Sequence, residues 1–436
     1  WRDQVLYFVM TDRFDDGDPS NNDQGAGEYQ PGSDAHYQGG DFAGLLRRLD
    51  YIRQLGATGL WITPPVLNQW WNANTRYGGY HGYWAAHFTQ VDPHLGTLDD
   101  YKALSDALHR RGMVLVQDIV LNHTADFFDY RGGWNPRDPA THWQANEGSR
   151  PMPRPTQAPF DRNDPRDPAQ RAQGIYHWTP DIRDHAIAQQ ELNFQLSGLD
   201  DLNTENPVVR RALRSSYAYW LREVGVDALR VDTALYVPPA LFDDFLYARD
   251  AQAPGLVAVA RSTGRQDFLT FGEGFAIDKP FETRAAQQIE RYATGPGGRL
   301  RMSGMLNFPL YGSLGSVMAR GRPTAELAHR IQSMMRVHRD PHRMPSFVDN
   351  HDVDRFRAGG SEAALKQALL ALMTLPGIPV IYYGTEQGFT EQRAAMFAAG
   401  WRSGGRDRFD TASPLFGYTA AAVALRRSQP LLSRGT

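Results

Sequence analysis

The stretch "MVLVQDIVLNH", residues 113 to 123, carries the pattern that decides the fold. Its first part is short, apolar and rich in β-branched residues, which is typical of a strand buried on both faces. Polar side chains mark its end, where Asp118, Asn122 and His123 stand. In parallel α/β folds, functional groups collect at the carboxyl ends of such strands. The stretch therefore indicates a buried parallel strand with a candidate site at its end.

Seven further apolar runs have the same character. They cover residues 5–10, 59–63, 227–232, 268–273, 305–310, 345–350 and 378–384. Helix-like stretches lie between most of them, as at 42–56, 98–112 and 206–225. Eight strands that alternate with helices predict a parallel (β/α)8 barrel built by right-handed crossovers. A doubly wound open sheet is the alternative, but the Gly-rich phosphate turn that usually follows its first strand is absent after Met10.

The segment after the third predicted strand does not follow this alternation of strands and helices. Within it, residues 150–170 are crowded with proline, arginine and aspartate. A long irregular excursion of this kind indicates a small inserted domain. We therefore predict a first barrel segment over 1–123, an inserted domain over 124–200 and a second barrel segment over 201–436.

Composition excludes several classes of site. The 436 residues carry a formal net charge of −3 without a long run of Lys or Arg, so nothing indicates a nucleic-acid partner. The absence of cysteine excludes disulfides, thiolate catalysis and zinc–sulfur sites. No apolar run is long enough to span a bilayer. We expect no organic cofactor, and the sequence does not indicate an oligomeric state.

The start of the chain bears on localisation. It lacks the basic and then apolar leader of a secretory signal, so any signal peptide would precede this numbering. We expect a secreted or periplasmic protein, and a cytoplasmic location stays open.

Charged residues stand at the ends of several predicted strands. Asp232 ends the fourth strand, Glu273 ends the fifth, and His351 and Asp352 follow the seventh. Arg230 lies two residues before Asp232, so their side chains point to the same side of the strand. Because the carboxyl ends of barrel strands meet in one mouth, we expect the three carboxylates to lie together.

Carboxylates held close together can divide two chemical roles. Like charges raise one another's pKa, so one group can stay protonated while another stays ionised. Glycoside hydrolysis needs that division. A metal-dependent barrel hydrolase is a weaker alternative, because no His-x-His pair stands on a predicted strand. The other alternative is that these charged residues form separate surface ion pairs. In that case their presence at the ends of four strands would be a coincidence.

Six blocks resemble the alpha-amylase family of retaining glycoside hydrolases and transglycosylases, with motifs similar to its cyclodextrin glucanotransferases, maltogenic amylases and cyclomaltodextrinase-like members. The blocks are "YHGYW" (80–84), "DIVLNH", "DALRVD", "FGEGF" (271–275), "FVDNHD" and "GIPVIYYGTEQGF" (377–389). They follow the family order and span nearly the whole chain. The resemblance implies a (β/α)8 barrel with an inserted domain B after the third strand. The C-terminal β-sandwich of the family has no counterpart in this sequence.

The resemblance also implies roles for the strand-end residues. Asp232 would be the nucleophile, Glu273 the general acid and base, and Asp352 a stabiliser of the oxocarbenium-like transition state. Arg230 would hold Asp232 ionised, with Asp118 as a supporting residue. The substrate-binding residues that it implies are His81, Tyr83, His123, Arg230, Phe275 and His351.

The implied activity is cleavage of α-glucosidic bonds, α-1,4 bonds by expectation, in maltooligosaccharides or α-glucans. The reaction would pass through a covalent β-glycosyl-enzyme, with a carboxyl separation of about 5–5.5 Å. A transglucosylase that uses the same double displacement is the alternative. A non-catalytic amylase-like binding module is disfavoured, because Asp232, Glu273 and Asp352 are all present.

An acidic loop near the start could hold calcium, which prefers hard oxygen ligands, although such residues also form ordinary turns. It resembles the calcium loop of cyclodextrin glucanotransferases and maltogenic amylases. The ligands that the resemblance implies are Asp16, Asp18, Asn21, Asn22, Gly39 and Asp41. Asn122 and Asp201 match two ligands of a second family site, but Tyr236 replaces its usual histidine, so occupancy of that site is in question.

Two departures from the family pattern affect substrate recognition. Leu235 and Tyr236 replace a Lys-His pair on the acceptor side, so recognition of the leaving group must differ. On the donor side a family loop is shortened, and only Arg393 offers a match. Ser197 stands near the position of the central aromatic residue of the cyclising enzymes, so we do not expect cyclisation.

Overall fold

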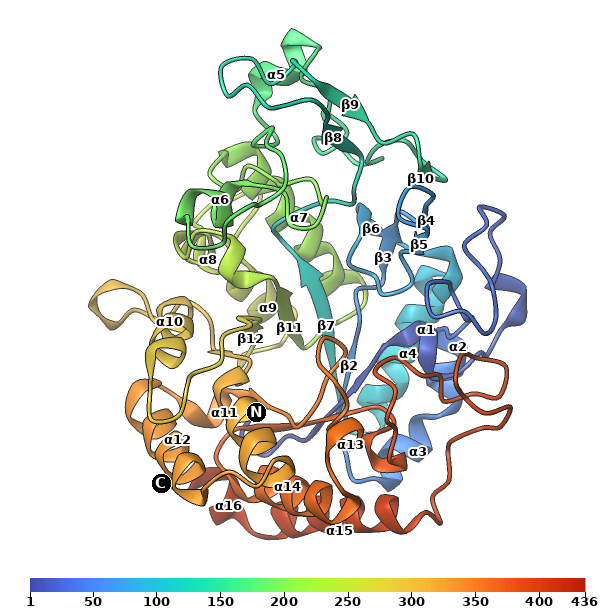
Figure 1. Ribbon diagram of the computed structural model, residues 1–436, viewed down its shortest axis with the longest axis vertical. Helices are drawn as coiled ribbons and strands as arrows, with labels where there is room; N and C mark the ends of the chain where they lie inside the picture. Colours follow the sequence, from blue (N-terminus) through green and yellow to red (C-terminus); the bar gives the residue numbers. More distant parts are fainter. Residues whose placement is uncertain (436) are drawn as a thin grey trace.

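The computed structural model describes residues 1–435. Eight strands form one sheet in the order β13-β12-β11-β7-β2-β1-β15-β14, and every pair is parallel (Figure 1). They are β1 (Leu6–Val9), β2 (Gly59–Ile62), β7 (Val114–Val120), β11 (Ala228–Asp232), β12 (Leu269–Gly272), β13 (Gly304–Met305), β14 (Pro345–Ser346) and β15 (Ile378–Tyr382). The sheet forms a nearly closed barrel, so the (β/α)8 prediction is confirmed. In the described chain the two end strands, β13 and β14, are not paired with each other.

The sixth strand is much shorter than the predicted run 305–310. It ends at Met305, and helix α11 (Phe308–Leu314) takes up the rest of the apolar residues. Asn307 starts this helix, because its side chain accepts a hydrogen bond from the Leu310 N–H. A short apolar run does not by itself distinguish a buried strand from the start of a buried helix.

Helices connect the strands in chain order. The longest are α4 (Leu98–Arg110), α7 (Pro207–Glu223), α12 (Thr324–Val337), α14 (Glu362–Thr374) and α15 (Pro414–Ser428). Shorter ones are α1 (Thr11–Phe14), α2 (Phe42–Arg47), α3 (Leu49–Gln54), α8 (Ala240–Tyr247), α9 (Leu256–Ser262), α10 (Arg284–Ala293), α13 (Phe356–Gly359) and α16 (Pro430–Arg434). The predicted helix over 42–56 is thus divided at Arg48, and the chain turns away at Gly56, where φ is +93°.

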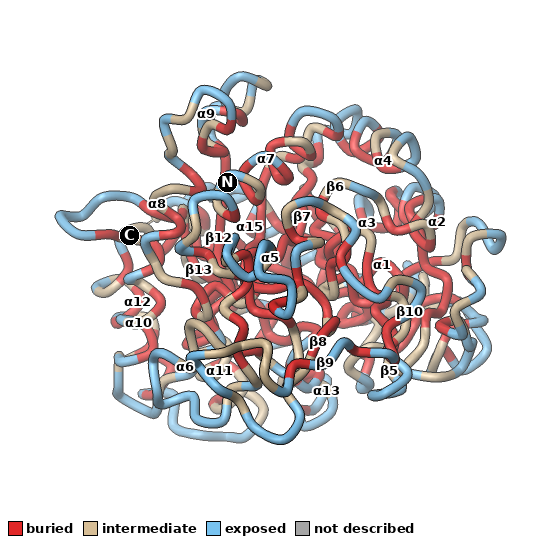
Figure 2. Tube along the Cα trace, turned by 90° about the horizontal axis from the view of Figure 1, so that it is seen from above, coloured by how far each residue is buried: buried red, intermediate tan, exposed pale blue. Residues whose placement is uncertain are grey.

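Buried aromatic rings fill the barrel beneath the carboxyl ends of its strands. Phe8 stacks on Trp61 with ring centroids 3.9 Å apart and on Tyr382 at 5.3 Å. Figure 2 shows the buried trace at the centre of the molecule with exposed loops around it. This packed core gives the strand ends a rigid base.

The segment after β7 departs from the barrel before the chain returns to it at β11. Its elements are β8 (Phe128–Tyr130), β9 (Trp143–Ala145), β10 (Ser149–Arg150), α5 (Pro168–Gln173) and α6 (Ala188–Asn193). β10 joins a small sheet with β4 (Trp71–Asn72) and β5 (Tyr77–Gly78), and β3 (Val66–Asn68) pairs with β6 (Ala85–Val91). In Figure 1, β8, β9 and α5 lie at the top of the view, far from α15. The domain boundaries at 123 and 200 stay a prediction.

Among the described residues, no helix combines the length and the apolar character that crossing a membrane requires.

Candidate active site

Three adjacent strands carry the central polar cluster. β7, β11 and β12 lie side by side, and their register places Arg230 directly beside Asp118. Asp232 is the last residue of β11, and Glu273 follows the last residue of β12. Parallel pairing therefore delivers all four side chains to the carboxyl edge of the barrel, as the strand-end pattern predicts.

The Arg230 guanidinium links the carboxylates of these strands. Its Nη1 lies 2.8 Å from Asp118 Oδ1 and 2.8 Å from Asp232 Oδ1, and its Nη2 lies 3.1 Å from Glu273 Oε2. Arg230 and Asp118 are fully buried, whereas Asp232 and Glu273 are each 8% exposed. One buried cation thus holds two partly accessible carboxyl groups close together.

A strained turn positions Glu273. Thr233 follows Asp232 with φ of +46°, a left-handed conformation that a β-branched residue rarely adopts. The turn aims the Thr233 N–H at Glu273 Oε2, at 2.9 Å. The backbone N–H of Ala234 also donates to the Glu273 carbonyl, at 3.0 Å. Strain of this kind is typical of functional sites.

Burial and neighbouring charge set the protonation of the cluster. Burial raises the pKa of Asp118 to about 6, although Arg230 opposes the shift. Burial likewise raises the pKa of Asp232 above its usual range; Arg230 lowers it, while Glu273 and Asp118 raise it further. Ionising all of these carboxyl groups at once is therefore unfavourable, which favours a state in which the carboxyl groups share a proton.

Asp352 brings the third carboxyl group into the same cluster. Its Oδ2 lies 3.3 Å from His351 Nε2, and its Oδ1 lies 3.7 Å from Arg393 Nη2. The side chain of Asp352 is 29% exposed, yet desolvation by the surrounding residues raises its pKa, while Arg230, Arg393 and the neighbouring Glu273 lower it. Residues 232, 273 and 352, remote in the chain, are thus neighbours in space.

Aromatic and imidazole rings line one wall beside these carboxyl groups. The Tyr83 ring is stacked with the His351 ring, with centroids 5.4 Å apart, and with the His81 ring, at 5.7 Å. Its hydroxyl donates to Asp118 Oδ2 at 2.9 Å, and its carbonyl lies 3.2 Å from His123 Nε2. Burial lowers the pKa of His123 to about 4 and the pKa values of His81 and His351 well below their usual range. These three rings are therefore neutral hydrogen-bonding groups at ordinary pH.

A cleft adjoins the cluster on the Glu273 side. Its volume is about 420 Å³, and Leu235, Tyr236, Phe275 and Lys279 line it. Phe275 is 55% exposed and packs on Phe308, with centroids 4.6 Å apart. An exposed, supported aromatic ring next to a carboxyl group is a suitable platform for a flat ligand.

Sequence reasoning missed two contributors to this site. Trp61 Nε1 donates to Asp118 Oδ2 at 3.2 Å, and the backbone N–H of Thr233 holds Glu273. Arg393 was found only as a match to a loop, yet its guanidinium reaches Asp352 and the hydroxyls of Tyr77 and Tyr80. A backbone donor leaves no pattern in a sequence, and the contacts of Arg393 join segments far apart in the chain.

The acidic loop offers oxygen atoms that lack partners. The buried atoms Asp16 Oδ1, Asn21 Oδ1 and Asn22 Oδ1 accept no hydrogen bond within the described residues. Gly39 lies directly against one of these residues, because a Cβ at this position would come within 2.5 Å of the Asn22 side chain. Three unpartnered oxygens of this kind fit a hard cation such as calcium.

The other two oxygen donors predicted for this loop have partners. Asp41 accepts the N–H groups of Gly17, Asp18 and Gly44, at 3.1, 2.7 and 2.6 Å, and so caps α2. Asp18 accepts from Ser20 at the surface. Among residues 1–435 there is no group of three or more His, Asp or Glu side chains that could hold a metal ion. Any cation here would therefore depend mainly on amide oxygens and Asp16.

The second predicted calcium position is satisfied by protein groups. With its amide nitrogen turned toward them, Asn122 donates to the Tyr236 carbonyl at 2.9 Å and to Asp201 Oδ1 at 3.3 Å. His177 bonds the other oxygen of Asp201 and lies 3.1 Å from Glu205 Oε2. Burial lowers the pKa of His177, but these two partners outweigh it and raise the pKa to about 9. An imidazolium already supplies positive charge here, so these residues do not call for a cation.

Comparisons with known proteins agree with this geometry. Residues 8–417 match the family described as "Alpha amylase, catalytic domain". The chain is 32% identical over 456 residues to a beta/alpha-amylase of Paenibacillus polymyxa, covering all of this chain and 31% of that protein. It is 31% identical over 468 residues to an alpha-amylase of Streptomyces lividans, covering 93% of this chain and 48% of that protein. The chain thus spans about a third to a half of these curated relatives.

A solved structure extends the similarity to the whole barrel. A cyclomaltodextrin glucanotransferase with a three-domain ABC distribution superposes with a TM-score of 0.79 at 26% identity. The match covers 98% of this chain and 81% of that one. Fold, strand-end cluster and sequence therefore agree, and the chain belongs to the alpha-amylase family of glycosidases, whose catalytic domain it contains.

Proposed function

We propose that this chain is a retaining glycosidase that cleaves α-glucosidic bonds, α-1,4 bonds above all, in maltooligosaccharides or α-glucans. The observation that carries the proposal is the Arg230 guanidinium, which contacts both Asp232 and Glu273. Retaining enzymes keep their two carboxyl groups about 5–5.5 Å apart, whereas inverting enzymes leave about 6.5–9.5 Å for a water molecule. Two carboxyl groups that share one guanidinium favour the shorter separation.

The first step transfers the glycosyl group to the enzyme. Protonated Glu273 donates its proton to the glycosidic oxygen while ionised Asp232 attacks the anomeric carbon. The glycosidic bond breaks, the leaving sugar departs with the proton, and a covalent β-glycosyl ester forms on Asp232. Asp352 stabilises the positive charge that develops on the ring, through hydroxyl groups of the sugar.

The second step restores the enzyme. Glu273, now a carboxylate, removes a proton from water, and the hydroxide oxygen attacks the anomeric carbon from the face that the leaving sugar vacated. The ester bond breaks and Asp232 leaves as a carboxylate. In this scheme Tyr83 stacks on the sugar ring, while neutral His81, His123 and His351 hydrogen-bond its hydroxyls.

Transfer to a sugar acceptor is the second candidate function. The exposed Phe275 ring and the neighbouring Tyr236 give the Glu273 side an aromatic surface on which an acceptor ring can stack. An acceptor bound there competes with water for the covalent intermediate. The similarity to a solved glucanotransferase supports this possibility.

The stereochemistry of the product tests the main proposal. We expect proton NMR of freshly digested maltopentaose to show the α-anomer at the new reducing end before mutarotation, because two inversions retain configuration. Products shorter than the substrate indicate hydrolysis, and longer ones indicate transfer. Initial release of the β-anomer would contradict the retaining mechanism, and binding without any reaction would favour a non-catalytic module.

We also propose that the acidic loop holds a structural calcium ion through Asp16, Asn21 and Asn22, with Asp18, Gly39 and Asp41 completing the loop around it. The unpartnered oxygens of the first three residues support this assignment. When bound, the ion would neutralise Asp16 and tie the loop to the start of α2. It takes no part in the reaction. The secreted or periplasmic location stays a prediction.

Chelation tests the calcium proposal. Calcium at a hundred times its Kd would stabilise the fold by about 2.7 kcal/mol, so removing it should lower the Tm by a few degrees. We expect a chelator to lower the Tm of the wild type but not that of Asp16→Ala. Asp23→Ala, in the same loop, should respond like the wild type, because Asp23 only caps the Gly25 N–H. An unchanged wild-type Tm after chelation would refute the site.

A further inference from the structure

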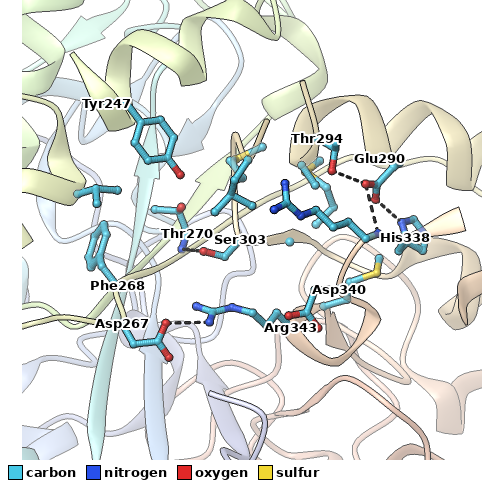
Figure 3. Close-up of a pocket in the computed structure, with 18 of the residues that line it drawn as sticks. Tyr247, Asp267, Phe268, Thr270, Glu290, Thr294, Ser303, His338, Asp340 and Arg343 are labelled. Carbon is cyan, nitrogen blue, oxygen red and sulfur yellow. Dashed lines mark hydrogen bonds and ion pairs between the residues drawn. The ribbon is translucent and has the colours of Figure 1, made fainter. Parts of the chain in front are cut away.

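A second cavity lies at the opposite end of the barrel from the carboxylate cluster. Figure 3 shows residues that line it. Its volume is about 300 Å³. Residues at the amino ends of β12, β13 and β14 line it, among them Phe268, Ser303 and Met344, whereas Glu273 stands at the other end of β12. β13 and β14 are the two strands that do not pair with each other, so the cavity lies at the seam where the barrel is not closed.

One side of this cavity is aromatic and its remaining apolar surface is adaptable. Figure 3 shows the rings of Tyr247 and Phe268 on the same side. The apolar residues that complete the lining include Met302, Met305 and Met344, all buried. Methionine side chains adjust to irregular shapes, so this surface can accept the carbon face of a ring against the two aromatic groups.

The facing side carries a fixed polar pair. Glu290 Oε2 lies 2.9 Å from His338 Nδ1, and Glu290 Oε1 accepts from the Thr294 hydroxyl at 2.6 Å. The carboxylate thus fixes the orientation of the buried His338 ring. Within residues 1–435, His338 Nε2 makes no hydrogen bond, and His338 lines the cavity. One ring nitrogen is therefore available to a ligand.

Two more polar side chains of the lining are incompletely bonded. Arg343 donates through Nη1 to Asp267 at 2.8 Å, but its buried Nε has no partner in the described chain. Asp340 accepts from Arg2 through Oδ2 at 2.9 Å, but its buried Oδ1 has none there either. One unpartnered atom is a donor and the other is an acceptor, and each is costly to leave unpaired.

We propose that this cavity is a second binding site, which takes a single sugar ring. A hydroxyl group both donates and accepts, so a sugar can serve Arg343 Nε and Asp340 Oδ1 alike. A carboxylate ligand only accepts and an ammonium ligand only donates, so neither serves both. The lining is also balanced in charge, with Arg261, Arg339 and Arg343 against Asp267, Glu290 and Asp340.

The size of the cavity limits the ligand. About 300 Å³ is the lower end of the range for small-molecule sites, so one ring fits and an oligosaccharide does not. The carbon face of the ring lies on Tyr247 and Phe268, and its hydroxyls meet His338, Arg343 and Asp340. This assignment rests on the cavity alone and not on the reaction proposed at Glu273.

A blocking variant tests the site. Val257, on α9, lines the cavity, and Val257→Trp should fill it. We expect glucose binding, followed by calorimetry and saturation-transfer NMR, to contain a component that Val257→Trp weakens at least tenfold. Leu431→Trp, at a position 81% exposed on α16, should keep that component. The Tm of each variant shows whether it is folded. If folded Val257→Trp bound glucose with the same titration curve as the wild type, the proposal would be overturned, whatever the activity of the enzyme.

Smaller changes test the chemistry without filling the cavity. Arg343→Met and Asp340→Ala should each weaken the glucose component about tenfold, since each removes one hydrogen-bonding partner. Hexanoate and hexylamine serve as charged probes of similar size. If either of them, rather than glucose, shows the binding that Val257→Trp removes, the sugar assignment is wrong. If both polar variants bind glucose as the wild type does, it is likewise overturned.

Discussion

Replacing Glu273 by glutamine should lower kcat toward maltooligosaccharides by about 10²–10⁴-fold, the usual contribution of a general acid. Release of fluoride from α-maltosyl fluoride in the first turnover should fall much less, because fluoride leaves without being protonated and Glu273 is needed as a base only in the second step. Glutamine has the same shape, and its oxygen can still accept from the Thr233 N–H, which now bonds Glu273 at 2.9 Å. The variant should therefore fold normally. The ratio of the two rates, measured on purified protein, isolates the loss of the proton.

Asp232→Asn is the matched control for this experiment. It replaces the attacking carboxylate by an uncharged amide, which is a poor nucleophile, so the rates on both substrates should fall by several orders of magnitude. If Glu273→Gln instead hydrolysed maltooligosaccharides at a nearly normal rate, the acid and base role would pass to another residue. If the rates of Glu273→Gln on the two substrates fell by the same factor, the residue would act on binding or folding and not on proton transfer.

The position of this cluster could be predicted from the sequence because two simple rules determine it. Apolar runs at intervals gave the strands, and parallel strands bring their carboxyl ends to one edge. The two-residue spacing of Arg230 and Asp232 gave their common direction, since side chains alternate along a strand. Asp232, Glu273 and Asp352 therefore meet although at least forty residues separate each from the next.

Other features depend on contacts that no local pattern encodes. The left-handed turn at Thr233 follows from packing between two strands, and nothing about threonine suggests it. The run 305–310 became a helix after Met305 because Asn307 caps it, and an apolar run alone fits either structure. The second cavity is lined by residues 247, 268, 290, 303 and 338, which are far apart in the chain and come together only in the folded barrel.

Arg230→Lys should lower kcat/KM roughly 10²–10³-fold at neutral pH, as expected when a preorganised charged donor is lost. A lysine ammonium is a compact charge without the planar fork, so it cannot reach Asp118, Asp232 and Glu273 together as the guanidinium does. Burial already raises the pKa of Asp232, and Arg230 is the group that opposes the shift. A weaker cation should raise that pKa further, so less of the nucleophile is ionised.

The pH dependence of this variant gives the sharper test. Because Asp232 must be ionised to attack, the acid limb of its kcat/KM profile should move to higher pH than in the wild type. The stability of the fold should depend on pH in the same direction. Burial raises the pKa of Asp118 in the folded protein to about 6. A raised folded pKa means that the free energy of unfolding falls as pH rises from the unfolded pKa to the folded pKa. The deficit in Tm relative to the wild type should therefore be larger at pH 8 than at pH 5. An acid limb that stays in place, with only kcat reduced, would mean that Arg230 orients Asp232 without controlling its charge.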